Sequence, residues 1–241
     1  MSVLACFVDN TRMGHYIYQR VHGHIIVNIA GRPCVLDTGS VLSIGAYPIT
    51  IRGREFEVHD SYLDVTCEYL SREIGTRVEG LIGADIISQF TLGIYPTEQM
   101  VQFEESPAEG GIVVPIDNFM GVPILKFAYD GKVLPAFFDT GAPLSYLLAE
   151  QLEGLQPEGV QEEFYSPIGN FLTPVYQLPI KVGGECHSLR FGCLPEELRP
   201  MLEAGGVKAI LGSGLLKHFG MCLSIRDQVL KLDAAINSVA A

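Results

Sequence analysis

Short apolar runs broken by Gly, Pro and polar residues dominate the hydrophobic pattern of this chain. Runs of this length between turn residues are typical of β-strands. The pattern predicts strands at 3–8, 24–29, 49–58, 112–116 and 124–129. Helical signals are few and brief, at 86–90, 147–152 and 215–219, with a further helix start at Pro195. The chain is therefore predicted to be mainly β.

The same order of elements is written twice. A shift of 129 positions aligns residues 78–103 with 207–232 without a gap, and a shift of 102 aligns 33–39 with 135–141. Such internal similarity indicates one structural unit used twice. We expect a first lobe over 1–105 and a second over 106–241, joined by the polar, Gly-containing stretch 104–111.

The second copy carries extra residues. The two shifts differ by 27 positions, which places an insertion at about 147–177. Within it, strand-like arms at 161–165 and 170–176 flank Ser166-Pro167-Ile168-Gly169. Pro in second place and Gly in fourth suit a type I turn, so the insertion is predicted to form a β-hairpin.

Two matching motifs carry the candidate chemistry. Val35-Leu36-Asp37-Thr38-Gly39-Ser40 and Phe137-Phe138-Asp139-Thr140-Gly141-Ala142 each lead an apolar run into a carboxylate, Thr, Gly and a small residue. A carboxylate at the end of a buried strand is costly unless it is hydrogen-bonded, which suggests a functional site. Gly two places later permits a sharp turn and the close approach of another loop.

With each Asp-Thr-Gly followed downstream by an apolar pair and Gly (Leu81-Ile82-Gly83; Ile210-Leu211-Gly212), the chain resembles the pepsin and retropepsin superfamily of aspartic proteases. The resemblance spans nearly the whole length. It implies two homologous β-barrel-like lobes of the acid protease type, with an active-site cleft between them. It implies an aspartic endopeptidase that needs no metal and no cofactor and acts on peptides or flexible protein segments.

The resemblance also assigns roles. Asp37 and Asp139 would be the catalytic carboxylates, and the apolar-apolar-Gly elements would thread behind them. The supporting loop residues would be Thr38, Gly39, Ser40, Thr140, Gly141 and Ala142, with the two threonines bonded across to the opposite loop. The hairpin would be a flap over bound peptide, with the substrate-binding residues Phe164, Ser166, Pro167, Ile168, Gly169, Asn170 and Phe171.

Two carboxylates a few ångströms apart cannot both ionise, so the pair would share one proton and hold a water between them. Ser40 follows the first Gly, whereas Ala142 follows the second. If the Ser40 hydroxyl donates to Asp37 it lowers the pKa of Asp37, which leads us to expect the shared proton on Asp139.

Two departures from the family pattern concern the cleft and the oligomeric state. The flap is in the second copy, and only six residues separate Ser40 from Tyr47, so the cleft should be covered from one side and open from the other. Ala84 and Ser213 stand where retroviral enzymes carry an Arg that pairs their subunits. One chain already holds both motifs, so a monomer suffices for a complete site. The sequence leaves the oligomeric state open.

Composition and charge limit the partners. The formal charge is −12 with a pI near 4.9, which disfavours nucleic acid and anionic membranes as partners. No apolar run reaches the roughly 18 residues that span a bilayer.

The six cysteines show no metal-type spacing, and Cys6, Cys34 and Cys222 lie in apolar runs. Buried free thiols indicate a reducing compartment, so we expect a cytoplasmic protein.

Alternatives remain at this point. The same fold could hold peptides without cutting them, as a regulatory module, or the chain could be a β-rich structural protein.

His22 and His24 could share a strand face as metal ligands, but two half-exposed histidines are the simpler interpretation. Asp85 is expected to cap the helix at 86–90, and Glu162-Glu163 to form a solvated face. Apolar walls are expected from Leu42, Ile44, Phe164, Ile168 and Phe171, which would favour apolar side chains around the cut.

Overall fold

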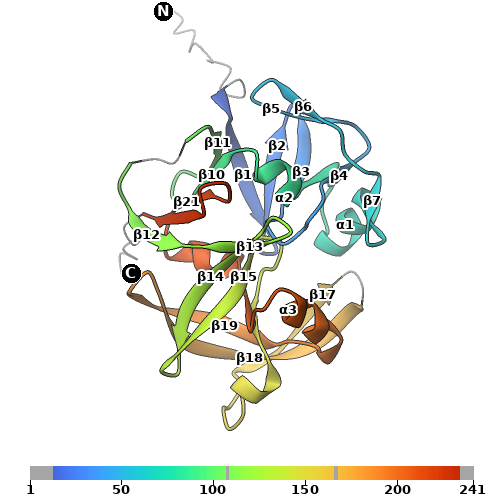
Figure 1. Cartoon of the computed structure of the whole chain (residues 1–241). Helices are drawn as coiled ribbons and strands as arrows, with labels where there is room; N and C mark the ends of the chain where they lie inside the picture. The colour runs from blue at the N-terminus through green and yellow to red at the C-terminus, as the bar shows by residue number, and fades with distance from the viewer. Residues whose placement is uncertain (1–12, 107–108, 166–167, 234–241) are drawn as a thin grey trace, which may run out of the picture.

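The computed structural model describes residues 13–106, 109–165 and 168–233, and the fold is mainly β, as predicted (Figure 1). Residues 13–106 are called the N-terminal lobe here and 109–233 the C-terminal lobe. The predicted strand at 3–8 lies outside the described residues.

The N-terminal lobe is built on a mixed sheet. In order along the sheet its strands are β1 (His15–Val21), β2 (His24–Ile29), β3 (Arg32–Leu36), β9 (Gly80–Ile82) and β4 (Ile44–Gly45). β3 leads into the first motif and pairs parallel with β9, while the other neighbouring strands are antiparallel. The predicted strand at 49–58 is instead a hairpin of β5 (Ile49–Ile51) and β6 (Arg54–Phe56). The chain reverses there because Arg52 and Gly53 both have positive φ.

Two elements of this lobe were not predicted. A second, shorter hairpin joins β7 (Ser61–Tyr62) to β8 (Val65–Thr66), and helix α1 (Cys67–Ile74) follows it directly. Thr66 caps α1, because its Oγ1 accepts a 3.1 Å hydrogen bond from the Tyr69 N–H. The helix ends at Gly75, which adopts a φ of 73°.

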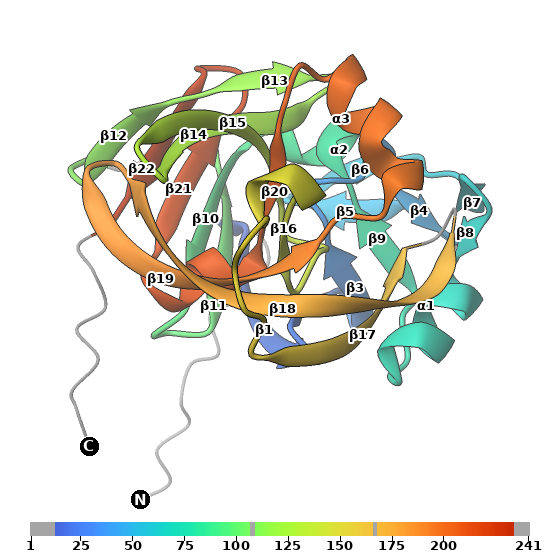
Figure 2. The same ribbon diagram turned by 90° about the horizontal axis from the view of Figure 1, so that it is seen from below.

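The C-terminal lobe contains an eight-stranded sheet with the long strand β18 running across it (Figure 2). Its order is β13 (Asp117–Phe119), β14 (Val122–Tyr129), β15 (Lys132–Asp139), β20 (Ala209–Gly212), β16 (Ser145–Leu147), β19 (Glu185–Cys193), β18 (Gly169–Val182) and β17 (Gly159–Tyr165). Short helical turns η2 (Ala149–Gln151) and η3 (Glu196–Leu198) and helix α3 (Arg199–Ala204) complete it. β17 and β18 pair from Gly159↔Val175 to Tyr165↔Gly169, so the predicted hairpin is present, with its tip, Ser166 and Pro167, outside the described residues.

One sheet crosses from lobe to lobe. The strands β12 (Ile112–Pro115), β22 (Val229–Leu232) and β21 (Met221–Ser224) join β10 (Thr91–Tyr95), and β10 continues through β11 (Met100–Glu104) to β1. The lobes meet where β10 pairs antiparallel with β21, Leu92 opposite Leu223. Both leucines are fully buried in a hydrophobic cluster that takes residues from both lobes. Apolar burial therefore fixes the lobes to each other.

Elements related by the 129-residue shift are of the same kind. β9 corresponds to β20, helix α2 (Ala84–Ile87) to the helical turn η4 (Ser213–Lys217), β10 to β21 and β11 to β22. The two short helices begin two residues earlier than predicted, and Phe90 and Phe219 follow them as buried anchors. Asp85 is not the cap of α2, which starts after Gly83. Its carboxylate accepts hydrogen bonds from the Ser43 hydroxyl and the Ile86 N–H.

Cys34 and Cys222 are buried, as their apolar surroundings predict. Burial raises the pKa of the Cys34 thiol to about 12, which leaves it protonated and unreactive. None of the helices in the described part of the chain combines the length and the apolar character that crossing a membrane requires.

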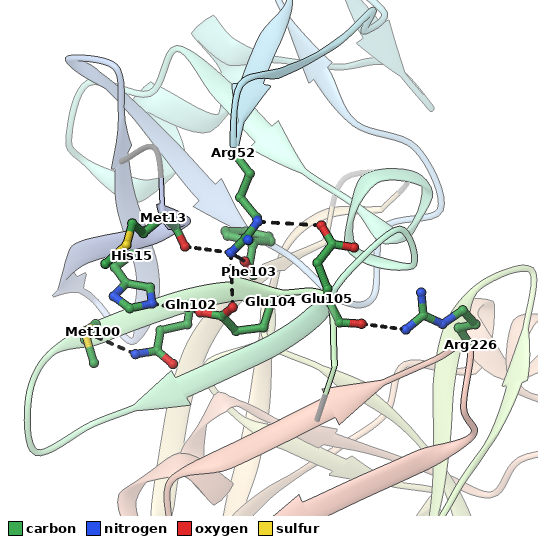
Figure 3. A network of polar contacts seen from close by, with 9 residues as sticks. All are labelled: Met13, His15, Arg52, Met100, Gln102, Phe103, Glu104, Glu105 and Arg226. Atoms are coloured by element: carbon green, nitrogen blue, oxygen red, sulfur yellow. Dashed lines mark hydrogen bonds and ion pairs between the residues drawn. The ribbon is translucent and has the colours of Figure 1, made fainter. Parts of the chain in front are cut away.

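A polar network holds the hairpin β5–β6 against β11 (Figure 3). The Arg52 Nη1 donates to the carbonyl of Met13 at 2.7 Å, to that of Phe103 at 3.2 Å and to Glu104 Oε2 at 3.1 Å. His15 contacts the other Glu104 oxygen at 2.7 Å. The Arg226 guanidinium, from the C-terminal lobe, donates to the carbonyl of Glu105 at 2.8 Å. The network thus anchors the end of β11 before the chain crosses between lobes.

We predict that Arg52→Met lowers the free energy of unfolding by about 1–2 kcal/mol, because charge-assisted bonds to partly buried carbonyls are lost. Arg72→Met is the matched control, since Arg72 is 69% exposed and contacts the adjacent Glu73 and the Tyr69 ring at the surface of its own helix. The control should stay within about 0.5 kcal/mol of wild type. Urea unfolding of both variants measures the difference, and equal effects would contradict this role for Arg52.

Candidate active site

The two motifs leave parallel strand pairs at equivalent places. β3 runs parallel to β9 with Leu36 opposite Ile82, and β15 runs parallel to β20 with Asp139 opposite Gly212. The Asp37 N–H donates to the carbonyl of Ile82 at 3.0 Å. Each apolar-apolar-Gly element therefore lies behind the motif of its own lobe, and both aspartates leave their strands at the lobe interface.

Two buried threonines lock the loops together. The N–H of Thr38 donates to the Oγ1 of Thr140 at 3.0 Å, and the N–H of Thr140 donates to the Oγ1 of Thr38 at 2.9 Å. Each hydroxyl then donates across the interface, Thr38 to the carbonyl of Phe138 at 2.7 Å and Thr140 to that of Leu36 at 2.8 Å. Four hydrogen bonds between fully buried groups leave no donor or acceptor unpaired, which fixes the relative position of the two turns.

Each carboxyl group is held by its own loop and touches the other. The N–H groups of Gly39 and Ser40 both donate to Asp37 Oδ1 at 2.9 Å, and those of Gly141 and Ala142 donate to Asp139 Oδ1 at 2.8 and 3.2 Å. A Cβ on Gly39 would overlap the carboxyl of Asp139, and one on Gly141 would overlap that of Asp37. Only glycine permits this approach. The structure thus brings together Asp37 and Asp139, 102 positions apart in the chain.

Desolvation dominates the electrostatics of the pair. Both carboxyls lie on the floor of a deep cavity, and loss of water there raises the pKa of each above its ordinary value. The neighbouring charge of Asp139 and a hydrogen bond with it raise the pKa of Asp37 further. The two groups therefore titrate as a unit and hold one proton between them.

The expected hydrogen bond from Ser40 to Asp37 is absent. The Ser40 hydroxyl donates to the carbonyl of Leu42 at 2.9 Å and not to Asp37. Its short side chain reaches the next turn of its own loop, and only its N–H donates to the carboxylate. Asp139 has a further backbone donor in Gly39, and the hydrogen bond between the carboxyls lowers the pKa of Asp139 and raises that of Asp37, so the asymmetry is opposite to the expected one and favours the proton on Asp37.

The cavity above the carboxyls has a volume of about 320 Å³ and mainly apolar walls. One wall belongs to the N-terminal lobe and includes Val35, Ile44, Leu70, Ile74 and Leu81. The opposite wall belongs to the C-terminal lobe and includes Val122, Phe137, Leu198, Met201 and Ile210. Leu42, expected in the first wall, does not line the cavity. The carboxyl pair lies between two apolar surfaces.

The predicted flap residues divide into three groups. Phe164 and Phe171 line the cavity, and Ile168 packs on the hydrophobic cluster of the C-terminal lobe. Asn170 is exposed, and Gly169 has the φ of 75° that a turn requires. Ser166 and Pro167 lie outside the described residues. The arm of the hairpin reaches across to the N-terminal lobe, where the Phe164 ring lies 6.1 Å from Tyr69 of α1 and 5.9 Å from His24.

The cleft was expected to be open on the side of the N-terminal lobe, but a hairpin of that lobe lines it. No hairpin occurs between Ser40 and Tyr47, but the hairpin β7–β8 borders the cavity with Tyr62, Leu63 and Val65. This segment follows β6 and is too short and polar to have been recognised as strands. The cleft is therefore walled by both lobes.

His24 was missed as a residue of this site. It is buried, lines the cavity and lies beside the backbone of Gly141, whereas it was expected to be half-exposed. Burial lowers the pKa of His24 to about 4, so the ring is neutral at neutral pH. Its burial depends on Phe164, which is 140 positions away, and no local pattern could have shown it.

Glu163 also differs from its expectation as a solvated residue. Glu162 is exposed, but Glu163 lines the cavity, and its carboxylate accepts hydrogen bonds from Gln161 and Tyr146. Loss of water raises the pKa of this carboxyl. Alternation along β17 explains the difference, because adjacent residues face opposite sides of the hairpin.

Comparisons with known proteins find similarity among solved structures. No family model matches the sequence, and no curated protein does. The chain is similar to the simian foamy virus (mac) protease, with 21% identity over 39% of this chain and 91% of that one and a TM-score of 0.30. It is similar to a retropepsin-like aspartic protease from Rickettsia conorii, with 19% identity over 54% of this chain and 95% of that one and a TM-score of 0.37. A foamy viral protease-reverse transcriptase in complex with an RNA/DNA hybrid matches at 18% identity over 47% of this chain and 13% of that one, with a TM-score of 0.32.

One of these solved structures is a retropepsin-like aspartic protease, the class of protein that the two motifs resemble. With TM-scores below 0.5, they leave activity to be judged from the site itself.

We predict that Thr38→Val lowers the free energy of unfolding by about 2–5 kcal/mol. The valine leaves the Thr140 N–H and the Phe138 carbonyl buried without partners, at about 1–3 kcal/mol each. Thr38→Ser keeps the hydroxyl and should cost only about 1 kcal/mol for the lost methyl. Urea unfolding distinguishes the two, and equal losses would show that packing, not hydrogen bonding, holds the loops.

The pH dependence of stability should change in Asp37→Asn. A raised pKa in the folded state contributes stability that is complete below the ordinary value of 3.8 and is lost as pH rises through the folded pKa. The variant removes one of the coupled ionisations, so it should gain stability relative to wild type as pH rises from about 4 to 8. Urea midpoints across this range test the sign, with Asp130→Asn, on an exposed turn, as control. Parallel curves for wild type and Asp37→Asn would contradict the coupled pair.

Proposed function

We propose that this chain is an aspartic endopeptidase that hydrolyses peptide bonds in peptides or flexible protein segments. One observation carries the proposal: two carboxyl groups from different lobes lie in contact, each with a pKa raised by burial, and both line a cavity with apolar walls. A buried pair of acids is costly for stability alone, and it is suited to activating water.

In the proposed reaction a water molecule is held between Asp37 and Asp139. The ionised carboxylate takes a proton from this water as its oxygen attacks the peptide carbonyl carbon. The protonated carboxyl donates its proton to the carbonyl oxygen, which stabilises the tetrahedral intermediate. When the C–N bond breaks, the aspartic acid that took the water proton gives it to the leaving amine. One hydroxyl of the intermediate passes its proton to the other aspartate as the carbonyl reforms in the new carboxyl end. The aspartates thereby recover their single shared proton.

The surrounding residues would position this pair. The N–H groups of Gly39, Ser40, Gly141 and Ala142 keep the inner oxygens fixed, and the threonine lock keeps the separation short. Rigid placement of reacting groups lowers the barrier because little reorganisation is needed during the reaction.

The substrate would lie in extended form between the lobes and under the hairpin β17–β18. The two apolar walls flank the carboxyls, so we propose a preference for large apolar side chains on both sides of the cut bond. We further propose that residues 1–105 and 106–241 are two lobes that arose by duplication. Both aspartates come from one chain, so a monomer would be active.

We predict that the full chain, incubated with a mixed peptide pool at several pH values, generates new peptide termini that mass spectrometry detects. Asp37→Asn and Asp139→Asn should each lower the initial rate at least about 10³-fold, because each removes one half of the general acid–base pair. Asp130→Asn, at an exposed turn, is the matched control and should cleave at the wild-type rate.

Binding measurements on the same variants separate the remaining possibility. Retention of peptides by wild type with no new termini at any pH would indicate a peptide-binding module on this fold. Cleavage that survives in both Asn variants would refute the assignment of the two aspartates.

A further inference from the structure

A second cavity lies at the junction of the lobes, behind the proposed active site. Its volume is about 340 Å³. Its walls come from β1 and the turn after it, from Pro143 and Leu144 beyond the second motif, from β17, β18 and β19, and from η4. The junction is tight, because the Ser213 hydroxyl donates to the carbonyl of Gly23 at 2.9 Å and a Cβ on Gly23 would overlap Pro143.

The charge of this cavity is opposite to that of the protein. Arg20, Arg190 and Lys217 line it, and none of its lining residues is Asp or Glu. The protein as a whole carries a formal charge of −12, and the cavity at the proposed active site is lined by three carboxyls and no Lys or Arg. Among the ion pairs of the described residues, none involves these three cations. The cavity is therefore a local concentration of positive charge, opposed only by the more distant carboxylate of Glu163 beside Arg190 among the interactions of the described residues.

Arg20 is the least satisfied of the three. Its Nη1 makes one long bond of 3.4 Å to the carbonyl of Gly23, and its Nη2 is buried with no hydrogen-bond partner. A buried guanidinium nitrogen without an acceptor is costly, and in folded proteins such a group usually meets an anion or water. This nitrogen without a hydrogen-bond partner is part of a side chain that lines the cavity.

We propose that this cavity is a binding site for a small phosphate-bearing anion. The planar fork of an arginine matches two phosphate oxygens, and the ammonium of Lys217 adds a point charge. A phosphate ester would partly neutralise Arg190 and Lys217, and would pair with Arg20 once its guanidinium turns toward the cavity. The volume leaves room for an organic group attached to the phosphate.

A chain of side chains leads from this site to the proposed active site. Arg190 Nη2 donates to Gln161 Oε1 at 2.9 Å, and Gln161 donates to Glu163, which also hydrogen-bonds Tyr146. Gln161 lines the anion cavity, whereas Glu163 and Tyr146 line the cavity above the aspartates. An anion that engages Arg190 would therefore alter the bonding of the flap strand β17. Any effect on cleavage rests on the proposed function, but binding does not.

Isothermal titration of the full chain at low ionic strength tests the proposal, with inorganic phosphate and glycerol 3-phosphate as separate probes. We expect saturable binding near one per chain, and tighter binding of glycerol 3-phosphate if an organic ester is the natural ligand. Arg20→Gln and Arg190→Gln should each weaken binding at least about tenfold, or about 1.4 kcal/mol. Arg77→Gln is the matched control, since Arg77 is 79% exposed and lies outside the cavity, and it should bind as wild type does.

Thermal unfolding supplies a readout independent of catalysis. Without phosphate, Arg20→Gln should melt no lower than wild type, because it removes an unpartnered buried group. Saturating phosphate should raise the melting temperature of wild type and of Arg77→Gln but not of Arg20→Gln. If Arg20→Gln does not fold, Arg190→Gln and Lys217→Gln decide in the same way. No binding of either probe at about 10 mM, or equal binding by wild type and the cavity variants, would overturn the proposal.

Discussion

The rest of the structure depends on holding two acids in contact away from bulk water. Such a pair is unstable by itself, because desolvation and mutual repulsion both oppose its ionisation. The threonine lock offsets this by pairing the N–H groups of both threonines and the carbonyls of Leu36 and Phe138, and the two glycines remove the side chains that would keep the loops apart. The continuous sheet through β10 and β21 then fixes the lobes on which the loops are mounted. Local hydrogen bonding and long-range sheet pairing therefore serve one purpose.

Charge is distributed to suit this arrangement. Acidic groups gather in the cavity between the lobes, and the cations Arg20, Arg190 and Lys217 lie behind it, on the far side of the second motif. The two regions communicate through Gln161, whose amide can accept from an arginine and donate to a glutamate at once. The strand β17 carries this amide and also the phenylalanine that reaches the opposite lobe. It thus lines both cavities and contacts both lobes.

Much of this could be predicted from the sequence, because the relevant signals are local or repeated. The motifs, the shift of 129 positions and the hairpin arms each follow from short patterns, and the strand at 24–29, the arms of the β17–β18 hairpin and the aspartate pair are found where they were expected. The strand expected at 49–58 is divided by the turn at Arg52 and Gly53. Ser40 donates to a carbonyl of its own loop instead of the carboxylate, a choice between two local acceptors that the sequence cannot rank. His24 was expected to be half-exposed, and the ring that packs on it, Phe164, is far away in the chain. Glu163 was expected to be solvated, but the alternation of β17 turns it into the cavity. The hairpin β7–β8 has only two residues in each strand, too few for a periodic pattern.

The pairing of β10 with β21 has a consequence for the two halves as separate molecules. Separating the lobes would remove β21 from β10 and leave a strand that is largely buried in the intact protein, with free backbone donors and acceptors, at a sheet edge. Exposed edges of this kind recruit other strands. An isolated half would thus be expected to self-associate. In the intact chain, covalent linkage of the halves keeps the edge of β10 paired with β21.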